Sequence, residues 1–357
     1  MFLKQVSLQN FRSYKKEKFE FEKETTLIVG PNTSGKSNLI ESIFLLATGK
    51  SFRADKDDQL IKFSEEIARV KGIVANIRGE ETELEVVLTI GEVGGRKTQS
   101  KKFLVNGVPR RRSDFAGNLP AVLFSPQDLD IIVESPSLRR RFLDNVLDQI
   151  DKEYVVSSTA YLKALRQRNA LLEKGRETGV RNEKQLEYWD HLVIENGEKI
   201  TQKRQEFLDF VNNATKDIFD FVIFYDKSVI SKARLEQYKE AEIGAGITLV
   251  GPHRDDFNIS MFDDANNTTH DVKFFGSRGQ QRLAILQLKM LELLYFEEKL
   301  GRKPVLLLDD IFSELDEEHI SLILEMLGNQ QIIITTAHQE LVPDKMGGKM
   351  KVIEFKK

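Results

Sequence analysis

The sequence predicts an α/β fold that combines an antiparallel β-layer with an inserted, mainly helical lobe. Three observations predict it. A short apolar strand runs into a glycine-rich loop and a helix at residues 27–47, and a second apolar strand ends in Asp309 and Asp310. Period-two alternation dominates residues 67–90, which is typical of strands. Residues 135–221 instead have helical periodicity and interrupt the α/β part of the chain.

The composition excludes several classes of protein. The 357-residue chain has no Cys, which excludes disulfides, thiol catalysis and Cys-ligated zinc and suits a reducing interior. No apolar run approaches the roughly 18 residues of a membrane span, and the N-terminus alternates like a strand instead of forming a signal peptide. We therefore expect a cytoplasmic protein that contacts no membrane. Because the net charge is −3, any nucleic-acid contact needs a local basic patch.

The N-terminal third predicts the β-layer. Residues 2–7 and 18–21 each alternate as strands before the glycine-rich loop. Residues 67–90 read as a hairpin, and a further hairpin turns at Asn106-Gly107, the strongest short hairpin signal. Basic residues cluster on these hairpins, and two interpretations stay open with equal weight, a solvated face and a phosphate-contacting surface. The cluster consists of Arg96, Lys97, Lys101, Lys102, Arg110, Arg111 and Arg112.

The glycine-rich loop carries the first candidate site. Residues 30–37 read G-P-N-T-S-G-K-S and fit the phosphate-binding pattern G-x-x-x-x-G-K-[ST]. Lys36 should reach the β- and γ-phosphates, and the Ser37 hydroxyl should bind Mg²⁺. A chance match is the alternative, but the strand before the loop and the helix after it favour a nucleotide site. The expected nucleotide contacts are Gly30, Pro31, Asn32, Thr33, Ser34, Gly35, Lys36, Ser37 and Asn38.

The middle of the chain predicts the helical lobe. A buried strand at 119–124 leads to helices at 135–150, 152–174 and 183–221, which form a helical hairpin. Residues 244–256 then predict a strand that ends in G-P-H-R-D-D. Either His253 or Arg254 senses phosphate there, or the segment is a structural turn with a local Arg–Asp pair.

The last third carries the second half of the site. Ser277 is a natural N-cap for a long helix that ends near residue 300, and its loop presents N–H groups to an anion. Residues 304–310, P-V-L-L-L-D-D, match the Walker B pattern, in which Asp309 supports Mg²⁺ and Asp310 activates water. A strand at 331–336 precedes His338, a candidate γ-phosphate sensor.

This ordered set of motifs resembles the ABC-type ATPase head and, within that group, the RecF family of bacterial recombination mediators. The matching pieces span nearly the whole chain. They are L-x-N-F-R-S-Y at 8–14, the P-loop, K-S-F-R at 50–53, F-S-P-Q-D at 124–128, G-P-H-R-D-D at 251–256, S-R-G-Q-Q-R at 277–282, D-D-I-F-S-E-L-D at 309–316 and T-A-H at 336–338. The implied head comprises residues 1–118 and 272–357, and the implied lobe comprises residues 119–271.

The resemblance also implies roles for single residues. Gln127 is similar to the Q-loop glutamine, which serves both the metal and the attacking water, Asp316 to the D-loop aspartate and His338 to the switch histidine. Asp310 stands where the wider ABC pattern has Glu, and this shorter side chain predicts slow hydrolysis. The nucleotide contacts implied outside the P-loop are Arg12, Ser277, Gly279 and Gln280.

The function implied is that of an ATP- and Mg²⁺-dependent homodimer that clamps DNA, with weak, DNA-stimulated ATPase activity. Ser277 of one chain would complete the ATP site of the other. The DNA would be a duplex or a junction of single and double strands, without sequence specificity. The implied partners are RecR and, indirectly, RecO and RecA, in DNA repair, DNA replication and the SOS response.

Three alternatives are weighed against this interpretation. The long separation of Lys36 and Asp309 argues against a transporter ATPase subunit. The lack of a long heptad arm argues against a chromosome-organising SMC protein. The sequence lacks the guanine-reading motif N-K-x-D, which argues against a GTPase switch.

Overall fold

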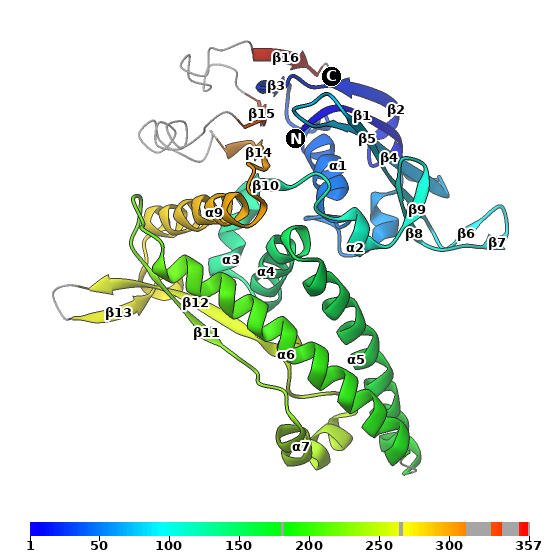
Figure 1. The fold of residues 1–357 in the computed structure, drawn as a ribbon, viewed down its shortest axis with the longest axis vertical. Helices are drawn as coiled ribbons and strands as arrows, with labels where there is room; N and C mark the ends of the chain where they lie inside the picture. Colours follow the sequence, from blue (N-terminus) through cyan, green and yellow to red (C-terminus); the bar gives the residue numbers. More distant parts are fainter. Residues whose placement is uncertain (180–181, 264–266, 312–329, 338–349, 356–357) are drawn as a thin grey trace. The chain divides into compact units, whose positions relative to one another are not determined.

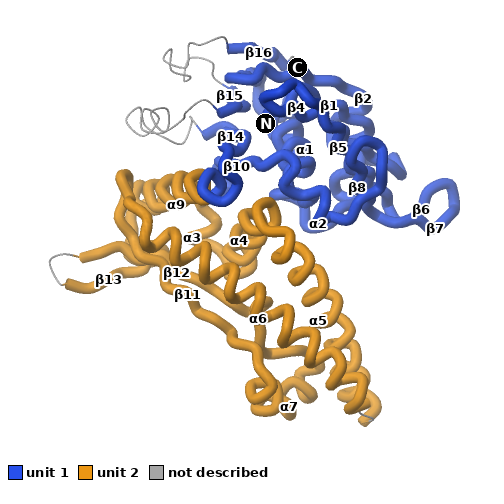
Figure 2. The backbone as a smooth tube through the Cα atoms, in the orientation of Figure 1, with its two compact units in different colours: residues 1–128, 296–357 blue, residues 129–295 orange. Residues whose placement is uncertain are grey.

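The chain divides into two compact units, which are described separately (Figures 1 and 2). In the computed structural model, the described residues are 1–179, 182–263, 267–311, 330–337 and 350–355. The first unit comprises residues 1–128 and 296–357, and the second comprises residues 129–295. No helix in the described part of the chain is long and apolar enough to cross a membrane.

The first unit contains a six-stranded antiparallel sheet in the order β2-β1-β4-β5-β8-β9. A register shift between Leu3 and Gln5 lets Leu3 and Val6 share the buried face although they are three residues apart. The predicted antiparallel β-layer is therefore confirmed. The strands are β1 (Phe2–Phe11), β2 (Tyr14–Glu20), β4 (Ile67–Ala75), β5 (Glu81–Thr89), β8 (Lys101–Val105) and β9 (Val108–Arg110), with a small hairpin of β6 (Glu92–Val93) and β7 (Arg96–Lys97).

Among the described residues of this unit, a second sheet has five parallel strands in the order β10-β14-β15-β3-β16. Its strands are β3 (Thr25–Val29), β10 (Ala121–Phe124), β14 (Val305–Asp309), β15 (Ile332–Thr336) and β16 (Met350–Glu354). Helix α1 (Lys36–Thr48) is buried along most of its length because it contacts strands of both sheets. Since parallel strands end at the same edge, the P-loop after β3 and Asp309 of β14 lie together. The unit also contains the short helices η1 (Asp57–Leu60), α2 (Arg112–Phe115) and η2 (Pro126–Leu129).

The second unit is built on an antiparallel hairpin of two long helices, α5 (Lys152–Thr178) and α6 (Glu183–Asn213). Figure 1 shows α4 and the β11-β12-β13 sheet beside this hairpin. The remaining helices are α3 (Asp130–Val133), α4 (Pro136–Ile150), α7 (Lys232–Ala245), η3 (Pro252–Arg254), α8 (Val272–Phe275) and α9 (Arg278–Leu300). The strands are β11 (Val222–Asp226), β12 (Asp256–Asp263) and β13 (Thr268–Asp271).

Two predicted elements of this unit are wrong. Helix α6 ends at Asn213 and not at residue 221, because the Asn212 side chain bonds both the N–H and the C=O of Ile223 and turns the chain back as β11. Residues 247–250, which lie directly before Gly251, do not form the predicted strand. There the Leu249 N–H donates to the buried Glu242 carboxylate instead of to a neighbouring strand.

The unit boundaries also differ from the predicted ones at 118/119 and 271/272. Strand β10 pairs with β14 in the parallel sheet, so residues 119–128 belong to the first unit. Residues 272–295 belong to the second unit, where Gln287 of α9 accepts from the Ile218 N–H and Tyr295 packs on Phe207. Most of the helix after the signature-like loop, residues 278–295, is therefore part of the second unit, and its last turn belongs to the first.

Candidate nucleotide-binding site

Two glycines shape the loop between β3 and α1. Gly35 has φ 104°, a conformation that residues with a Cβ rarely adopt, and it precedes the first residue of α1. Gly30 lies against the end of β16, where an added Cβ would stand 2.6 Å from the Cβ of Phe355. Within the loop, the Ser34 hydroxyl is buried and has no hydrogen-bond partner among the residues that the structure describes. An orphaned donor here fits the phosphate oxygens that the loop sequence predicts.

Lys36 currently uses its ammonium group on the loop itself. Its Nζ donates to the carbonyl oxygens of Gly30 at 2.6 Å and Pro31 at 3.0 Å. Burial lowers the pKa of Lys36, whereas the nearby carboxylates of Asp310 and Asp309 act to raise it. Charged phosphate oxygens are stronger acceptors than the two carbonyls. Lys36 is therefore positioned to exchange these contacts for a nucleotide.

Asp309 joins the P-loop to the end of β14. Its Oδ1 accepts hydrogen bonds from Ser37 Oγ at 3.0 Å and from Thr335 Oγ1 at 2.6 Å. Burial raises the pKa of Asp309, and the two hydroxyl donors partly oppose this by stabilising the carboxylate. The oxygen atoms of Ser37 and Asp309 are of the type that Mg²⁺ prefers, so this donor set fits the predicted metal.

Thr335 is a site residue that the sequence analysis did not single out. It lies opposite Asp309 because β14 and β15 pair in parallel with these two residues in register. The available signal was a Thr at the polar end of an apolar strand. The register that makes it a partner of Asp309 is not readable from the sequence.

Asp310 follows in a turn of its own. Its φ is 53°, and its backbone N–H donates to the Thr335 carbonyl at 3.0 Å. Asp residues adopt this left-handed conformation more readily than most others, so the turn suits Asp310. The carboxylate is near enough to Lys36 to raise the pKa of that lysine. The activation of water by Asp310 stays a prediction.

Gln127 lies beyond the carboxyl end of β10, the sheet neighbour of β14. It is exposed in η2, and the turn that contains it is fixed by a 2.6 Å hydrogen bond from the Ser125 N–H to the Asp128 carboxylate. This edge of the sheet is the one that carries Asp309. The metal and water contacts of Gln127 stay predictions.

Arg12 is already engaged by a carboxylate. Its guanidinium forms a two-pronged ion pair with Glu41 of α1, at 2.8 and 2.7 Å. Glu41 is fully buried and also accepts from Ser51 Oγ at 2.5 Å. A nucleotide contact by Arg12 stays a prediction, and in this structure the side chain instead joins the β1–β2 turn to the P-loop helix.

The signature-like residues lie in the second unit, at the N-terminus of α9. The Gln280 N–H donates to Ser277 Oγ at 3.2 Å, and the Ser277 N–H donates to Gln280 Oε1 at 2.9 Å. These reciprocal bonds form a capping box, so Ser277 is the predicted N-cap. Ser277 and Gly279 are exposed. Their contact with a nucleotide stays a prediction, as does that of Gln280.

His338 and Asp316 fall outside the described residues. The strand before His338 is present as β15 and ends at Thr336. The predicted roles of the two residues stay predictions.

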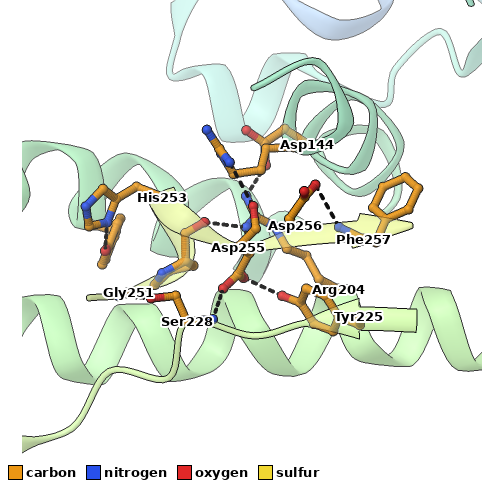
Figure 3. Close-up of polar contacts among 12 residues, drawn as sticks. Asp144, Arg204, Tyr225, Ser228, Gly251, His253, Asp255, Asp256 and Phe257 are labelled. Atoms are coloured by element: carbon orange, nitrogen blue, oxygen red, sulfur yellow. Dashed lines mark hydrogen bonds and ion pairs between the residues drawn. The ribbon is translucent and has the colours of Figure 1, made fainter. Parts of the chain in front are cut away.

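The G-P-H-R-D-D segment is a structural turn. Figure 3 shows Asp255 at its centre, where one carboxylate oxygen accepts from Arg204 at 3.1 Å and from the Tyr225 hydroxyl, and the other accepts from the Ser228 N–H. Asp256 pairs with Arg139 at 2.6 Å. The prediction of a structural turn is supported, but its Arg–Asp pairs are not local. Helices α4 and α6 supply the arginines, whereas Arg254 of the segment donates to the Thr248 carbonyl.

His253 is held within the same turn. Its Nδ1 accepts from the Tyr161 hydroxyl at 2.7 Å, and its Nε2 donates to the Thr248 carbonyl at 3.2 Å. Burial lowers the pKa of His253 to about 4, so the ring is neutral near pH 7. With both ring nitrogens used, these contacts favour the structural interpretation over phosphate sensing by His253.

Part of the basic hairpin cluster is committed to the fold. Lys101 pairs with Asp57 at 2.5 Å and donates to the Gly49 carbonyl. Five cations are exposed and form no ion pair with any residue that the structure describes; they are called the hairpin cations below. They are Arg96, Lys97, Lys102, Arg110 and Arg111.

Comparison with known proteins identifies the family. The model of the RecF/RecN/SMC N-terminal domain matches residues 2–355. The chain is 35% identical to the DNA replication and repair protein RecF of an Exiguobacterium species, over 100% of this chain and 98% of that protein. RecF of Moorella thermoacetica is also 35% identical, over 96% of this chain and 92% of that protein. The chain belongs to the RecF family.

Solved structures agree with this assignment. A recombination mediator protein RecF described as its ATP form in the RecFOR pathway superposes with a TM-score of 0.84 at 35% identity, covering 96% of this chain and 93% of that one. The Smc head of Pyrococcus furiosus superposes with a TM-score of 0.52 at 17% identity, which concerns the fold alone. The predicted RecF-type ATPase head is confirmed, and the transporter and chromosome-organising alternatives are set aside.

Proposed function

We propose that this RecF-family chain binds ATP and Mg²⁺ at the P-loop and that ATP drives a homodimer that clamps DNA during repair and replication. The observation that carries the proposal is the hydrogen-bonded set of Ser37, Asp309 and Thr335 beside Lys36. It supplies a lysine for the phosphates and hard oxygens for the metal. RecF relatives of known structure are described as ATP complexes, which supports ATP as the nucleotide.

The second half of each ATP site comes from another copy of the chain. Ser277 and Gly279 are exposed at the N-terminus of a 23-residue helix, whose first N–H groups and positive dipole end attract anions. The γ-phosphate would thus bridge Lys36 of one chain to Ser277 of the other. A ligand shifts an equilibrium only by its differential affinity, and this bridge exists only in the dimer.

Hydrolysis then resets the clamp. Asp310 activates water, and because its carboxylate is one methylene shorter than the usual Glu, the rate is low. DNA binding stimulates ATP hydrolysis. The hairpin cations contact DNA phosphates without reading the sequence. The DNA is a duplex or a single/double-strand junction. RecR is the protein partner, and through it RecO and RecA.

The dimer is tested by light scattering with and without ATP. Lys36→Arg should weaken both ATP binding and ATP-dependent dimerisation. Ser277→Arg should leave ATP binding by the monomer nearly intact and abolish the dimer, because the larger side chain fills the space of the partner's γ-phosphate. An ATP-dependent dimer of the Ser277→Arg protein would contradict the shared site.

A further inference from the structure

Phe63 is 95% exposed, more than any other large apolar side chain in the described part of the chain. The exposure does not come from a loosely held loop. The Lys62 N–H donates to the Asn10 carbonyl at 2.8 Å, and the Glu65 N–H donates to the Lys62 carbonyl at 3.0 Å. Asn10 Nδ2 also donates to the Glu65 carboxylate at 3.0 Å. Phe63 therefore projects into solvent from a hydrogen-bonded turn.

This turn is tied to one side of the P-loop. Lys62 Nζ donates to the Ser13 carbonyl at 2.9 Å, and Ser13 Oγ accepts from Asn38 Nδ2 at 3.0 Å. The next residue, Tyr14, donates its hydroxyl to the Gly35 carbonyl at 2.9 Å. Two linked contacts thus join the Phe63 turn to the first turn of α1.

These contacts lie on a different side of α1 from the contact between Ser37 and Asp309. Successive residues of a helix point about 100° apart, so Asn38 does not point where Ser37 points. Ser37 bonds Asp309, which marks the metal and γ-phosphate end of the site. Asn38 bonds Ser13, which marks another side, toward Phe63. A nucleotide with its γ-phosphate near Asp309 has its ribose and base at the opposite end of the phosphate chain.

We propose that Phe63 stacks on the purine base of the nucleotide. An aromatic ring offers a π-face to a base and requires no hydrogen-bond partner. Phe63 therefore contributes affinity for adenine and guanine alike, and discrimination between them has to come from other groups. The proposal rests on nucleotide binding at the P-loop but not on the dimer.

The test separates the base from the phosphates. Isothermal titration measures Mg²⁺-ATP and Mg²⁺-tripolyphosphate, which has no base, on the wild type and on Phe63→Ala. The variant should bind ATP about tenfold more weakly, the size of effect expected for one stacked base, and tripolyphosphate equally well. Ile77→Ala is the matched control, since Ile77 is 85% exposed at another hairpin turn of the same unit.

Each outcome decides something. Equal ATP affinities of Phe63→Ala and the wild type would overturn the stacking proposal alone. A wild-type protein that binds neither ATP nor tripolyphosphate would overturn nucleotide binding itself. Equal losses for both ligands would show that Phe63 acts through the P-loop backbone, which also overturns stacking.

A fluorescent variant gives an independent readout. The chain has one Trp, Trp189 in α6, so Phe63→Trp in a Trp189→Phe background carries a single fluorophore at the proposed stacking position. ATP should quench this fluorescence, whereas tripolyphosphate should not, because only ATP brings a base against the ring. Equal fluorescence changes with the two ligands would overturn stacking.

Discussion

At the scale of single residues, the buried carboxylate of Asp309 lowers the stability of the fold at the place where the metal is expected to bind. Burial raises the pKa of this carboxyl above its ordinary value of 3.8, so folding favours its protonated form. The penalty for the buried charge is absent below the ordinary pKa and complete above the raised one. The nucleotide-free protein therefore loses stability as the pH rises through this window, a cost that a bound Mg²⁺ offsets.

Asp309→Asn should make the nucleotide-free protein more stable, by about 1 kcal/mol, a usual gain when a strained functional group is neutralised. The amide oxygen can still accept from Ser37 and Thr335, while the buried charge is gone. Thermal unfolding with and without Mg²⁺-ATP measures both effects, and the variant should also lose the Mg²⁺ dependence of ATP binding.

Asp310→Asn is the matched control for this prediction. It should retain Mg²⁺-dependent ATP binding and lose hydrolysis. If Asp309→Asn is less stable than the wild type at neutral pH, the account of Asp309 as a penalised charge is wrong.

At the scale of elements, the sequence predicts what depends on local pattern and misses what depends on distant polar partners. The P-loop and the Walker B strand were predicted because each is one contiguous segment. The prediction extends helix α6 too far. The side chain of Asn212, at the end of this helix, bonds the backbone of Ile223 in β11, and a local pattern does not show such a partner. The strand predicted before Gly251 is absent because Glu242 of α7 binds its backbone. The role of Thr335 as a partner of Asp309 depends on the register of β14 and β15, which the sequence does not show.

Asp255, like Asp309, is a buried carboxylate, but it holds elements of the second unit together. Asp255→Ala should destabilise the second unit by about 3–5 kcal/mol. The buried Arg204 guanidinium would lose its ion pair with Asp255 and keep the one with Asp144. Trp189 fluorescence in urea reports this unit, since the chain's one Trp lies in α6. Asp226→Ala, at an exposed end of β11, should change stability little. Equal losses for the two variants would contradict a central role for Asp255.

The hairpin cations make a prediction about DNA. Replacing Arg110 and Arg111 by Ala should weaken binding similarly for all sequences and reduce the slope of log K against log salt by about 1 per cation. Lys18→Ala is the control, because Lys18 already pairs with Glu20 at 3.2 Å. Fluorescence anisotropy of a labelled duplex over a salt series measures the slopes. An unchanged slope would assign these arginines to the solvated face that the sequence analysis left open.

At the scale of the whole molecule, the two halves of the proposed site lie in different compact units. Lys36, Ser37 and Asp309 belong to the first unit, whereas Ser277 and Gly279 belong to the second. The motif order in the sequence predicted both halves. Which chain supplies which half depends on assembly, a property that no single-chain pattern encodes.

Mixing two defective proteins decides this question. Suppose one chain carries Lys36→Arg and the other carries Ser277→Arg. In a mixed dimer, one site combines both defects, while the other pairs a normal P-loop with a normal Ser277. If the halves come from different chains, each variant alone should be nearly inactive with ATP, and the mixture should regain hydrolysis at one site per dimer. Steady-state ATPase rates across a mixing series, with DNA present, measure this. A series that shows only the sum of the two separate rates would mean that each chain builds its site alone.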